Sequence, residues 1–280
     1  MQGIIVKNIS NDYTVRTNNQ DYICKCSGKI KYSKMTPLVG DKVLFNEKDN
    51  YIEKILPRQN ELIRPKVANI DIVLVVTSVK NPNFDTYLLD KLLTIISYNN
   101  ITPIICLTKL DLLTPLELQE IDKYISYYQS IGYTVITNTE LDKLKELMQN
   151  KIVAFAGQSG AGKSSLLNKL DSSLNLQTND ISYALNRGKH TTRHTELYQV
   201  GTSLIVDTPG FSQIDFTNMT KLDIRDNMPE MFNNLHLCKY SDCLHTKEEG
   251  CHVIELLNKN EILPSRYKNY QKFINNKQVI

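Results

Sequence analysis

The sequence predicts a multi-domain protein with three parts. We expect an N-terminal β-barrel of the OB type over residues 1–66, a central α/β domain over 67–215 and a mostly helical C-terminal domain over 216–280. Three observations support this division. The first part has short strand-like segments and no helical period, the second alternates apolar strands with helices, and the third contains clustered cysteine and histidine residues.

The first part contains short segments separated by turn residues such as Ser10-Asn11-Asp12 and Gly40-Asp41. The predicted strands are Gly3–Asn8, Asp12–Thr17, Asp21–Cys26, Lys42–Glu47 and Tyr51–Ile55. Five strands in about 60 residues are typical of a small OB-type barrel, and an SH3-like barrel is the alternative.

The charge of the first part indicates a partner. Residues 1–66 carry twelve Lys and Arg residues against seven Asp and Glu residues, although the whole chain has a net charge of only +3. The segment 24–37 places Lys25, Lys29, Lys31 and Lys34 around Tyr32. Basic residues beside an aromatic ring suit phosphate contact and base stacking, so we expect nucleic acid to bind here. A solvated lysine-rich surface has the same composition and remains the alternative.

The central part begins with Ile70–Thr77, a continuous apolar run typical of a strand buried on both faces of a parallel sheet. Strands and helices then alternate, as in an open α/β sheet. The predicted helices are Tyr87–Tyr98, Leu116–Ser130 and about 140–149, and the further strands are Thr102–Leu107, Thr134–Ile136, Ile152–Phe155 and Leu204–Val206.

Composition excludes some classes of protein. No apolar run approaches the roughly 18 residues that a membrane helix needs, and the first residues do not form a signal peptide, so we expect a cytoplasmic protein without a membrane partner. In that compartment the six cysteines are metal ligands or core thiols rather than disulfides.

A phosphate-binding loop follows the predicted strand Ile152–Phe155. The stretch GQSGAGKS matches the pattern G-x-x-x-x-G-K-[ST], and an amphipathic helix follows it. Backbone N–H groups of such a loop hold phosphate oxygens, Lys163 reaches the β- and γ-phosphates, and the Ser164 hydroxyl ligates Mg²⁺. The nucleotide-binding residues predicted here are Gly157, Gln158, Ser159, Gly160, Ala161, Gly162, Lys163, Ser164 and Ser165.

Two further motifs complete a GTP site. Asp207-Thr-Pro-Gly210 ends an apolar strand, where Asp207 can hold Mg²⁺ through water and the Gly210 N–H can sense the γ-phosphate. Thr108, Lys109, Leu110 and Asp111 form a T-K-x-D motif whose Asp accepts hydrogen bonds from guanine but not from adenine. This base-reading motif precedes the phosphate loop, whereas GTPases ordinarily place it after D-x-x-G. The order therefore predicts a circularly permuted GTPase domain, which nearby domain termini make possible.

The permuted order, the barrel and the cysteine cluster together resemble the small ribosomal subunit biogenesis GTPases of the RsgA/YjeQ type. The similarity extends over essentially the whole chain and includes Asn60-Glu-Leu-Ile-Arg-Pro65, Ala68-Asn-Ile-Asp71 and Gly188-Lys-His-Thr-Thr192. The resemblance implies a GTPase that binds the small ribosomal subunit and its rRNA late in assembly, hydrolyses GTP to GDP and phosphate, and then leaves.

The segment 187–197 is the predicted switch loop. By resemblance to GTPases with T-T-R in this loop, Thr192 ligates Mg²⁺, with Thr191 as its near neighbour. Phe211 stands where many GTPases have a water-orienting glutamine, so another group is needed, and His190 is the candidate catalytic residue beside Lys163. His194 is expected to be solvent-exposed. Thr137 or Asn138 can replace the usual contact with guanine O6.

Cys238, Cys243, His245 and Cys251 form the pattern C-x4-C-x-H-x5-C, which predicts one structural, four-coordinate Zn²⁺ site. His252 is the alternative to His245, and the family pattern favours His245. A segment this polar and small is expected to need the metal to fold. Cys24, Cys26 and Cys106 lack partners at useful spacing and are expected to be core or surface thiols. The segment Ser265–Lys272 is basic and aromatic on a predicted helix, where rRNA contact and a solvated helix face are both open.

Two other functions remain open at this stage. One is an RNA-binding assembly scaffold whose GTP site acts as a conformational switch with negligible hydrolysis, and intact Lys163, Ser164 and Asp207 argue against it only in part. The other is an ATP-dependent enzyme, which Asp111 disfavours. We expect a monomer.

Overall fold

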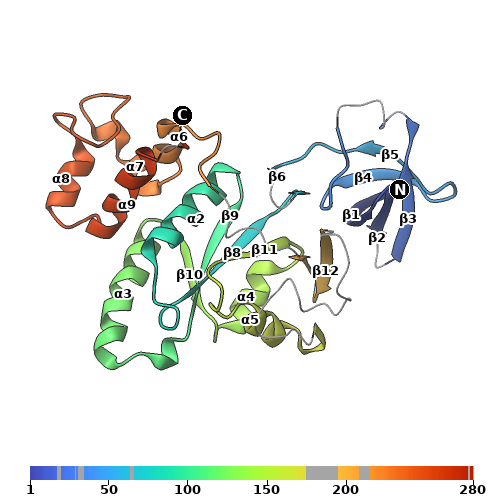
Figure 1. Cartoon of the computed structure of the whole chain (residues 1–280), viewed down its shortest axis with the longest axis horizontal. Helices are drawn as coiled ribbons and strands as arrows, with labels where there is room; N and C mark the ends of the chain where they lie inside the picture. Colours follow the sequence, from blue (N-terminus) through green and yellow to red (C-terminus); the bar gives the residue numbers. More distant parts are fainter. Residues whose placement is uncertain are drawn as a thin grey trace. The chain divides into compact units, whose positions relative to one another are not determined.

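The computed structural model in Figure 1 describes residues 1–17, 20–28, 30, 35–63, 66–174, 195–207, 215–276 and 278–279. The chain forms two compact units. Unit 1 consists of Met1–Val73, Leu141–Phe155 and Lys163–Phe211. Unit 2 consists of Leu74–Glu140, Ala156–Gly162 and Ser212–Ile280.

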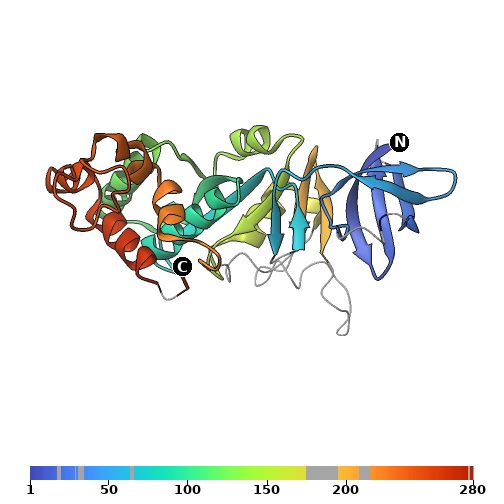
Figure 2. The same ribbon diagram turned by 90° about the horizontal axis from the view of Figure 1, so that it is seen from above.

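Unit 1 begins with the barrel, drawn in blue in Figures 1 and 2. Its strands are β1 (Gln2–Ile9), β2 (Asp12–Thr17), β3 (Gln20–Cys26), β4 (Lys42–Asn46) and β5 (Tyr51–Ile55). The strand order is β1-β2-β3-β5-β4, and β4 pairs back to β1, which closes the barrel. β3 and β5 run parallel, whereas the other neighbours run antiparallel. This topology confirms the OB-type barrel.

Alternation of side chains builds the barrel core. Residues two apart along a strand point to the same face, so Val43 and Phe45 of β4 are both buried while Leu44 between them is exposed. Ile5 of β1 and Ile52 of β5 are also buried. The periodicity that predicted the strands is therefore the periodicity that forms the core.

Three strands of unit 1 are absent from the sequence-based expectation. β6 (Glu61–Ile63) and β7 (Lys66–Ala68) form a short hairpin, and β12 (Glu196–Val200) lies between β13 (Ser203–Asp207) and β1. An ion pair of 2.7 Å between Lys7 Nζ on β1 and Glu196 Oε2 on β12 accompanies the pairing of these two strands.

The strand β11 (Ile152–Ala156) pairs in parallel with β13. Unit 1 also contains α4 (Leu141–Met148), α5 (Lys163–Leu170) and the 3-10 helix η2 (Ser172–Leu174).

Unit 2 contains the strands β8 (Ile72–Ser78), β9 (Thr102–Thr108) and β10 (Thr134–Thr137) in the order β10-β9-β8, with β8 beginning in unit 1. All residues of β8 are buried, as its apolar run predicted. The helices and 3-10 helices of unit 2 are α2 (Thr86–Tyr98), η1 (Leu110–Leu112), α3 (Pro115–Ser130), α6 (Lys221–Asp226), α7 (Pro229–Asn233), η4 (Leu235–Leu237), α8 (His252–Asn258) and α9 (Pro264–Ile274).

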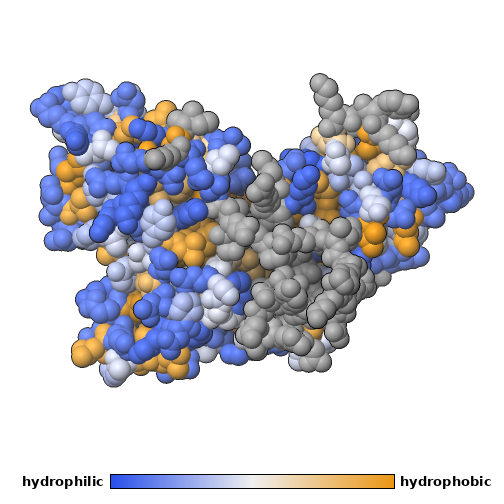
Figure 3. Space-filling view, viewed as in Figure 1, coloured by the Kyte–Doolittle hydropathy of each residue, from blue (hydrophilic) through white to orange (hydrophobic). Residues whose placement is uncertain are grey.

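The C-terminal segment has an apolar core of its own, which the polar composition had not indicated. Phe216, Met231, Tyr270 and Phe273 are fully buried there, together with Ile95 of α2. These apolar residues are spread over several short helices, so the sequence shows no 3.6-residue period that would have predicted their burial. Figure 3 shows mostly hydrophilic side chains over the surface of this segment.

A buried ion cluster fixes α9 within unit 2. The Arg266 guanidinium lies 2.6 Å from Asp90 Oδ1 on α2 and 2.5 Å from Glu230 Oε1 on α7, and all three side chains are buried. The Tyr128 hydroxyl donates to the same Asp90 oxygen at 2.6 Å. Removing one member of such a cluster leaves a buried charge without its partner, so the cluster holds α2, α7 and α9 in one arrangement. Arg266 is therefore not available at the surface as the basic segment 265–272 had indicated.

Among the helices of the described ranges, none combines the length and the apolar character needed to cross a membrane.

Candidate nucleotide site and metal cluster

The phosphate loop lies between β11 and α5, where glycine is required at one position in particular. Gly157 has a φ of +130°, and a Cβ built on it would lie 2.0 Å from the carbonyl oxygen of Val76 on β8. No side chain fits that distance. Gly160 and Gly162 also have positive φ values. Positive φ values of this kind are readily adopted only by glycine, and they let the loop turn its N–H groups toward one centre.

The first two residues of the T-K-x-D motif form hydrogen bonds with this loop. The Thr108 hydroxyl donates a hydrogen bond of 2.6 Å to the carbonyl oxygen of Ala161. The Lys109 ammonium donates to the carbonyl oxygen of Gly160 at 2.8 Å and to that of Asn81. Two motifs that are about 50 residues apart in sequence therefore form one structure. The sequence placed Lys109 in the base-reading motif. Its contacts with the carbonyls of Gly160 and Asn81 were missed, because no motif marks a carbonyl acceptor.

The remaining described residues of the predicted site are placed as follows. Asp111 lies on η1 with its side chain exposed, and Lys163 and Ser164 are the first two residues of α5. Ser164 is buried. Asp207 is the last residue of β13, paired across from Glu196, and only its backbone is described.

Thr137 and Asn138, at the end of β10, both form backbone hydrogen bonds near the base-reading motif. The Asn138 N–H donates to the carbonyl oxygen of Leu107 at 2.9 Å, and Glu140 Oε2 accepts from the Thr137 N–H at 2.7 Å. Thr137 is thus occupied by contacts within its own turn. The residue that contacts guanine O6 stays a prediction for Thr137 or Asn138.

Several predicted residues lie outside the described ranges. They are Thr191, Thr192, His190 and His194 of the switch loop, Gly210 and Phe211 after β13, and Lys29, Lys31, Tyr32 and Lys34 of the barrel loop.

The predicted zinc ligands come together at one point in unit 2. The sulfur atoms of Cys238, Cys243 and Cys251 and a ring nitrogen of His245 all lie within 4.8 Å of one another. His245 Nδ1 lies 3.5 Å from Cys238 Sγ and 3.3 Å from Cys251 Sγ. Three sulfurs and one imidazole nitrogen at these separations fit a tetrahedral metal site.

The groups around the cluster orient its members. His245 Nε2 lies 3.1 Å from the carbonyl oxygen of Met231, which leaves Nδ1 directed toward the sulfurs. The Tyr267 hydroxyl donates to the carbonyl oxygen of His245 at 2.7 Å. Burial raises the pKa of the Cys243 thiol to about 12, with the neighbouring Cys251 and Cys238 adding to the effect. Burial also lowers the pKa of His245. A cation bound here would replace the thiol protons that this environment otherwise retains.

The other candidate ligand and the other thiols are separate from this cluster. His252 begins α8, and its Nδ1 lies 3.4 Å from Glu255 Oε2, outside the four-residue group. Cys24, Cys26 and Cys106 are buried, so they are core rather than surface thiols.

Comparison with known proteins identifies the family. The sequence matches the RsgA GTPase family over residues 55–217 and the RsgA N-terminal domain over residues 2–52. The chain belongs to the RsgA GTPase family.

Relatives of similar length support this assignment. "Small ribosomal subunit biogenesis GTPase RsgA 2" of Oceanobacillus iheyensis is 45% identical over 98% of the chain and 96% of that protein. "Small ribosomal subunit biogenesis GTPase RsgA" of Enterococcus faecalis is 43% identical over 98% of the chain and 94% of that protein.

Solved structures agree in fold. The crystal structure of YloQ, described as a circularly permuted GTPase, matches 98% of the chain and 93% of its own with a TM-score of 0.82 and 35% identity. YjeQ from Thermotoga maritima matches 98% and 97% with a TM-score of 0.85 and 31% identity. The permuted GTPase domain read from the motif order is therefore confirmed, and membership of the family supports GTP hydrolysis rather than a non-hydrolysing scaffold.

Proposed function

We propose that the chain hydrolyses GTP to GDP and phosphate during late maturation of the small ribosomal subunit, which it binds through rRNA as a cytoplasmic monomer. The names of its relatives, which describe GTPases of small ribosomal subunit biogenesis, support this partner. The observation that carries the GTP site is the pair of hydrogen bonds from Thr108 and Lys109 to carbonyls of the phosphate loop. They join the proposed base-reading motif to the proposed phosphate loop, which supports a single nucleotide site.

The roles of single residues follow from the loop and its neighbours. The N–H groups of residues 157–165 hold the phosphates, Lys163 neutralises charge on the β- and γ-phosphates, and Asp111 accepts from the guanine edge. His190 orients the attacking water, and the Gly210 N–H contacts the γ-phosphate.

Two metal ions belong to the proposal, one Mg²⁺ bound with the nucleotide and one structural Zn²⁺. The hydroxyls of Ser164 and Thr192 are hard oxygen ligands that would hold Mg²⁺, with Asp207 contributing through water. Mg²⁺ bound with the nucleotide supplies charge neutralisation. One Zn²⁺ in the Cys238–Cys251 cluster has a structural role, because four protein ligands leave no open position.

We also infer that the three domains cover residues 1–66, 67–215 and 216–280. The end of the GTPase match at residue 217 supports the border near 215, whereas the matches meet at residues 52–55, before the border proposed at 66.

Phosphate release from GTP and ATP, with and without purified small ribosomal subunits, tests this function. We expect GTP-selective hydrolysis that rises with subunits and falls in Lys163→Ala and His190→Ala. Asp111→Ala should lose the preference for GTP over ATP. Subunit binding without stimulated hydrolysis would favour a non-hydrolysing switch. An unchanged preference in Asp111→Ala would refute the base-reading assignment.

A further inference from the structure

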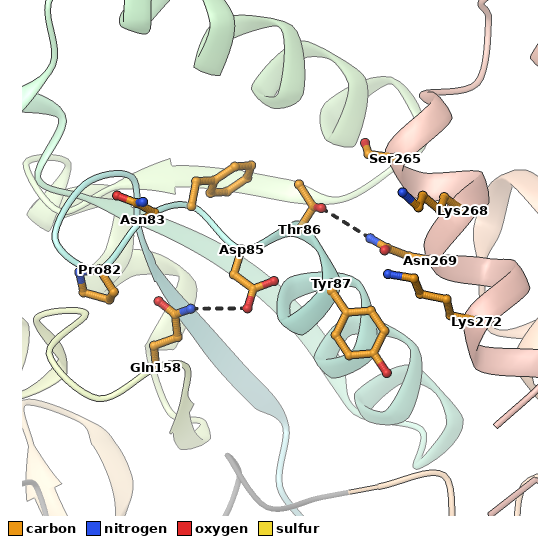
Figure 4. A pocket seen from close by; sticks show the side chains of 11 residues that line it. Pro82, Asn83, Asp85, Thr86, Tyr87, Gln158, Ser265, Lys268, Asn269 and Lys272 are labelled. Atoms are coloured by element: carbon orange, nitrogen blue, oxygen red, sulfur yellow. Dashed lines mark hydrogen bonds between the residues drawn. The ribbon is translucent and has the colours of Figure 1, made fainter. Parts of the chain in front are cut away.

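A hollow of about 590 Å³ lies in unit 2 between the start of α2 and one side of α9. Figure 4 shows its two walls. One wall consists of residues 82–87 together with Gln158 of the phosphate loop, and the other carries Ser265, Lys268, Asn269 and Lys272 of α9. The proposed GTP site does not use this hollow, although Gln158 belongs to both.

Two cations face the hollow from α9. Lys268 and Lys272 are four residues apart, which places them one above the other on the same side of the helix. Both are exposed, and within the described ranges neither forms an ion pair. The Lys272 ammonium lies 5.3 Å from the centre of the Tyr87 ring, a contact that leaves its charge uncompensated.

The carboxylate on the opposite wall is already engaged. Asp85 Oδ1 accepts a hydrogen bond of 3.1 Å from the N–H of Leu88, which caps α2, and its Oδ2 lies 3.4 Å from Gln158 Nε2. These donors and the positive end of the α2 dipole offset the charge of Asp85. The two lysines therefore give the hollow its net positive character.

The part of α9 that carries the two lysines is fixed before a ligand binds. Asn269, between them, is buried and donates to Asp90 Oδ2 at 2.7 Å and lies 3.3 Å from the Thr86 hydroxyl on α2. Arg266, one turn earlier, is fixed by the buried ion cluster. Because the register of α9 against α2 is set by these contacts, little backbone entropy is lost when a ligand meets the lysines.

We propose that this hollow binds phosphodiester groups of RNA, with Lys268 and Lys272 as the contacts. Two ammonium groups in series on a rigid helix suit a ligand that carries its negative charges in series. The walls offer further donors from Ser265 and Asn83, as is common around nucleic-acid phosphates. The inference rests on the proposed function only in naming rRNA of the small subunit as the RNA.

Occupancy of the hollow would place an RNA phosphate beside the phosphate loop. Gln158 follows Gly157 directly and shares Asp85 with the start of α2. A contact made here is therefore next to the loop that holds the nucleotide.

The full-length double variant Lys268→Gln/Lys272→Gln tests the proposal against a matched control, Lys123→Gln/Lys259→Gln, which removes two exposed lysines elsewhere in unit 2. Dissociation constants are measured from 50 to 200 mM salt for intact small subunits and for protein-free rRNA extracted from them. We expect affinity for both probes to fall roughly tenfold in the first variant, with a salt slope smaller by about 1.5. The control should stay close to the parent protein, and Lys268→Arg/Lys272→Arg should restore binding.

The other outcomes are distinct. Equal losses in the test and control variants would overturn the proposal, because charge alone would then explain them. Loss of subunit binding with unchanged binding of protein-free rRNA would also overturn it, in favour of an acidic protein segment. If the parent protein binds protein-free rRNA through these lysines but does not bind subunits, the proposed partner fails and the phosphate site stands.

Discussion

Thr108 and Lys109 belong to the T-K-x-D motif and also form hydrogen bonds with the phosphate loop. A phosphate loop directs its N–H groups at the ligand, so its carbonyl oxygens need partners elsewhere. The Thr108 hydroxyl and the Lys109 ammonium provide donors for the carbonyls of Ala161 and Gly160. The bond to Ala161 is buried, and a buried carbonyl left without a donor costs about 1–3 kcal/mol. The residue types of the base-reading motif are thus explained partly by the loop that they support.

Gly157 yields a prediction at the same scale. In Gly157→Ala the added methyl group meets the Val76 carbonyl oxygen at 2.0 Å, in a backbone conformation that costs an L-residue about 1–3 kcal/mol by itself. The loop must shift, and a shift of about 1 Å can cost roughly 100-fold in a positioned site. We expect at least about tenfold weaker GTP binding, measured by fluorescence titration with a labelled guanine nucleotide.

Gly132→Ala is the matched control for this change. Gly132 has a φ of +98°, but nothing lies within 4 Å of its added methyl group. This variant should lose a similar amount of stability from backbone strain while its GTP affinity stays unchanged. Equal nucleotide affinity in both variants would show that the contact with Val76 does not position the loop.

At the scale of elements, the sequence predicted the bounds of helices and strands best where one hydrophobic period, of two or of 3.6 residues, dominates the segment. The barrel strands and α2 agree with the structure to within about two residues, because alternation or 3.6-residue spacing marks each of them. β6 and β7 were missed because strands of three residues are too short to display a period. β12 was missed because its buried residues, Leu197 and Val200, are three apart and do not alternate as in a half-buried strand. The core of the C-terminal segment was missed for a related reason, since its apolar residues come from several short helices.

The N-terminus of α3 carries a prediction for pH dependence. Thr114 and Glu117 form a capping box, and Lys80 Nζ lies 2.9 Å from both Glu117 carboxylate oxygens. The Thr114 backbone N–H, followed by the Lys80 and Thr114 side chains, holds the pKa of Glu117 at about 2, below its ordinary value of 4.5. A carboxyl group whose pKa is depressed on folding stabilises the fold above about pH 4.5, and that contribution is lost as the pH falls toward 2.

Glu117→Gln should therefore lower the thermal midpoint at pH 7, and its difference from the parent protein should narrow as the pH falls from 4.5 toward 2. Glu120→Gln on the exposed side of the same helix loses only a surface pair with Lys123 and should change the midpoint little. Thermal unfolding followed by circular dichroism measures both. A difference that does not change with pH would mean that the ionised carboxylate is not what caps α3.

At the scale of the whole molecule, the order of motifs predicted more than any single motif. A K-x-D triplet is common by chance, but one that precedes a phosphate loop and D-x-x-G indicates a permuted domain, and the solved relatives have that fold. Contacts between distant segments could not be predicted in this way. The Asp90–Arg266–Glu230 cluster joins residues 176 positions apart, and each of these residues by itself looks like an ordinary surface charge in the sequence.

The metal cluster gives the last prediction, because it lies beside a core that the sequence did not indicate. Cys243→Ser removes one of the four converging ligands, and we expect the protein to lose the zinc proposed for this cluster and at least about 3 kcal/mol of stability. Phe216 and Phe273 are buried in an apolar core that also includes Ile95 of α2, so helix content should survive in part. The near-ultraviolet signal of Tyr267 and Tyr270, which contact His245, should decrease. Zinc content by atomic emission, together with far- and near-ultraviolet circular dichroism, separates these effects.

Cys106→Ala, a change at a buried thiol outside the cluster, should keep the zinc. Full retention of zinc and of the unfolding midpoint in Cys243→Ser would show that the four residues do not form a metal site, and complete loss of helix content would show that the apolar core cannot hold α8 and α9 without the metal.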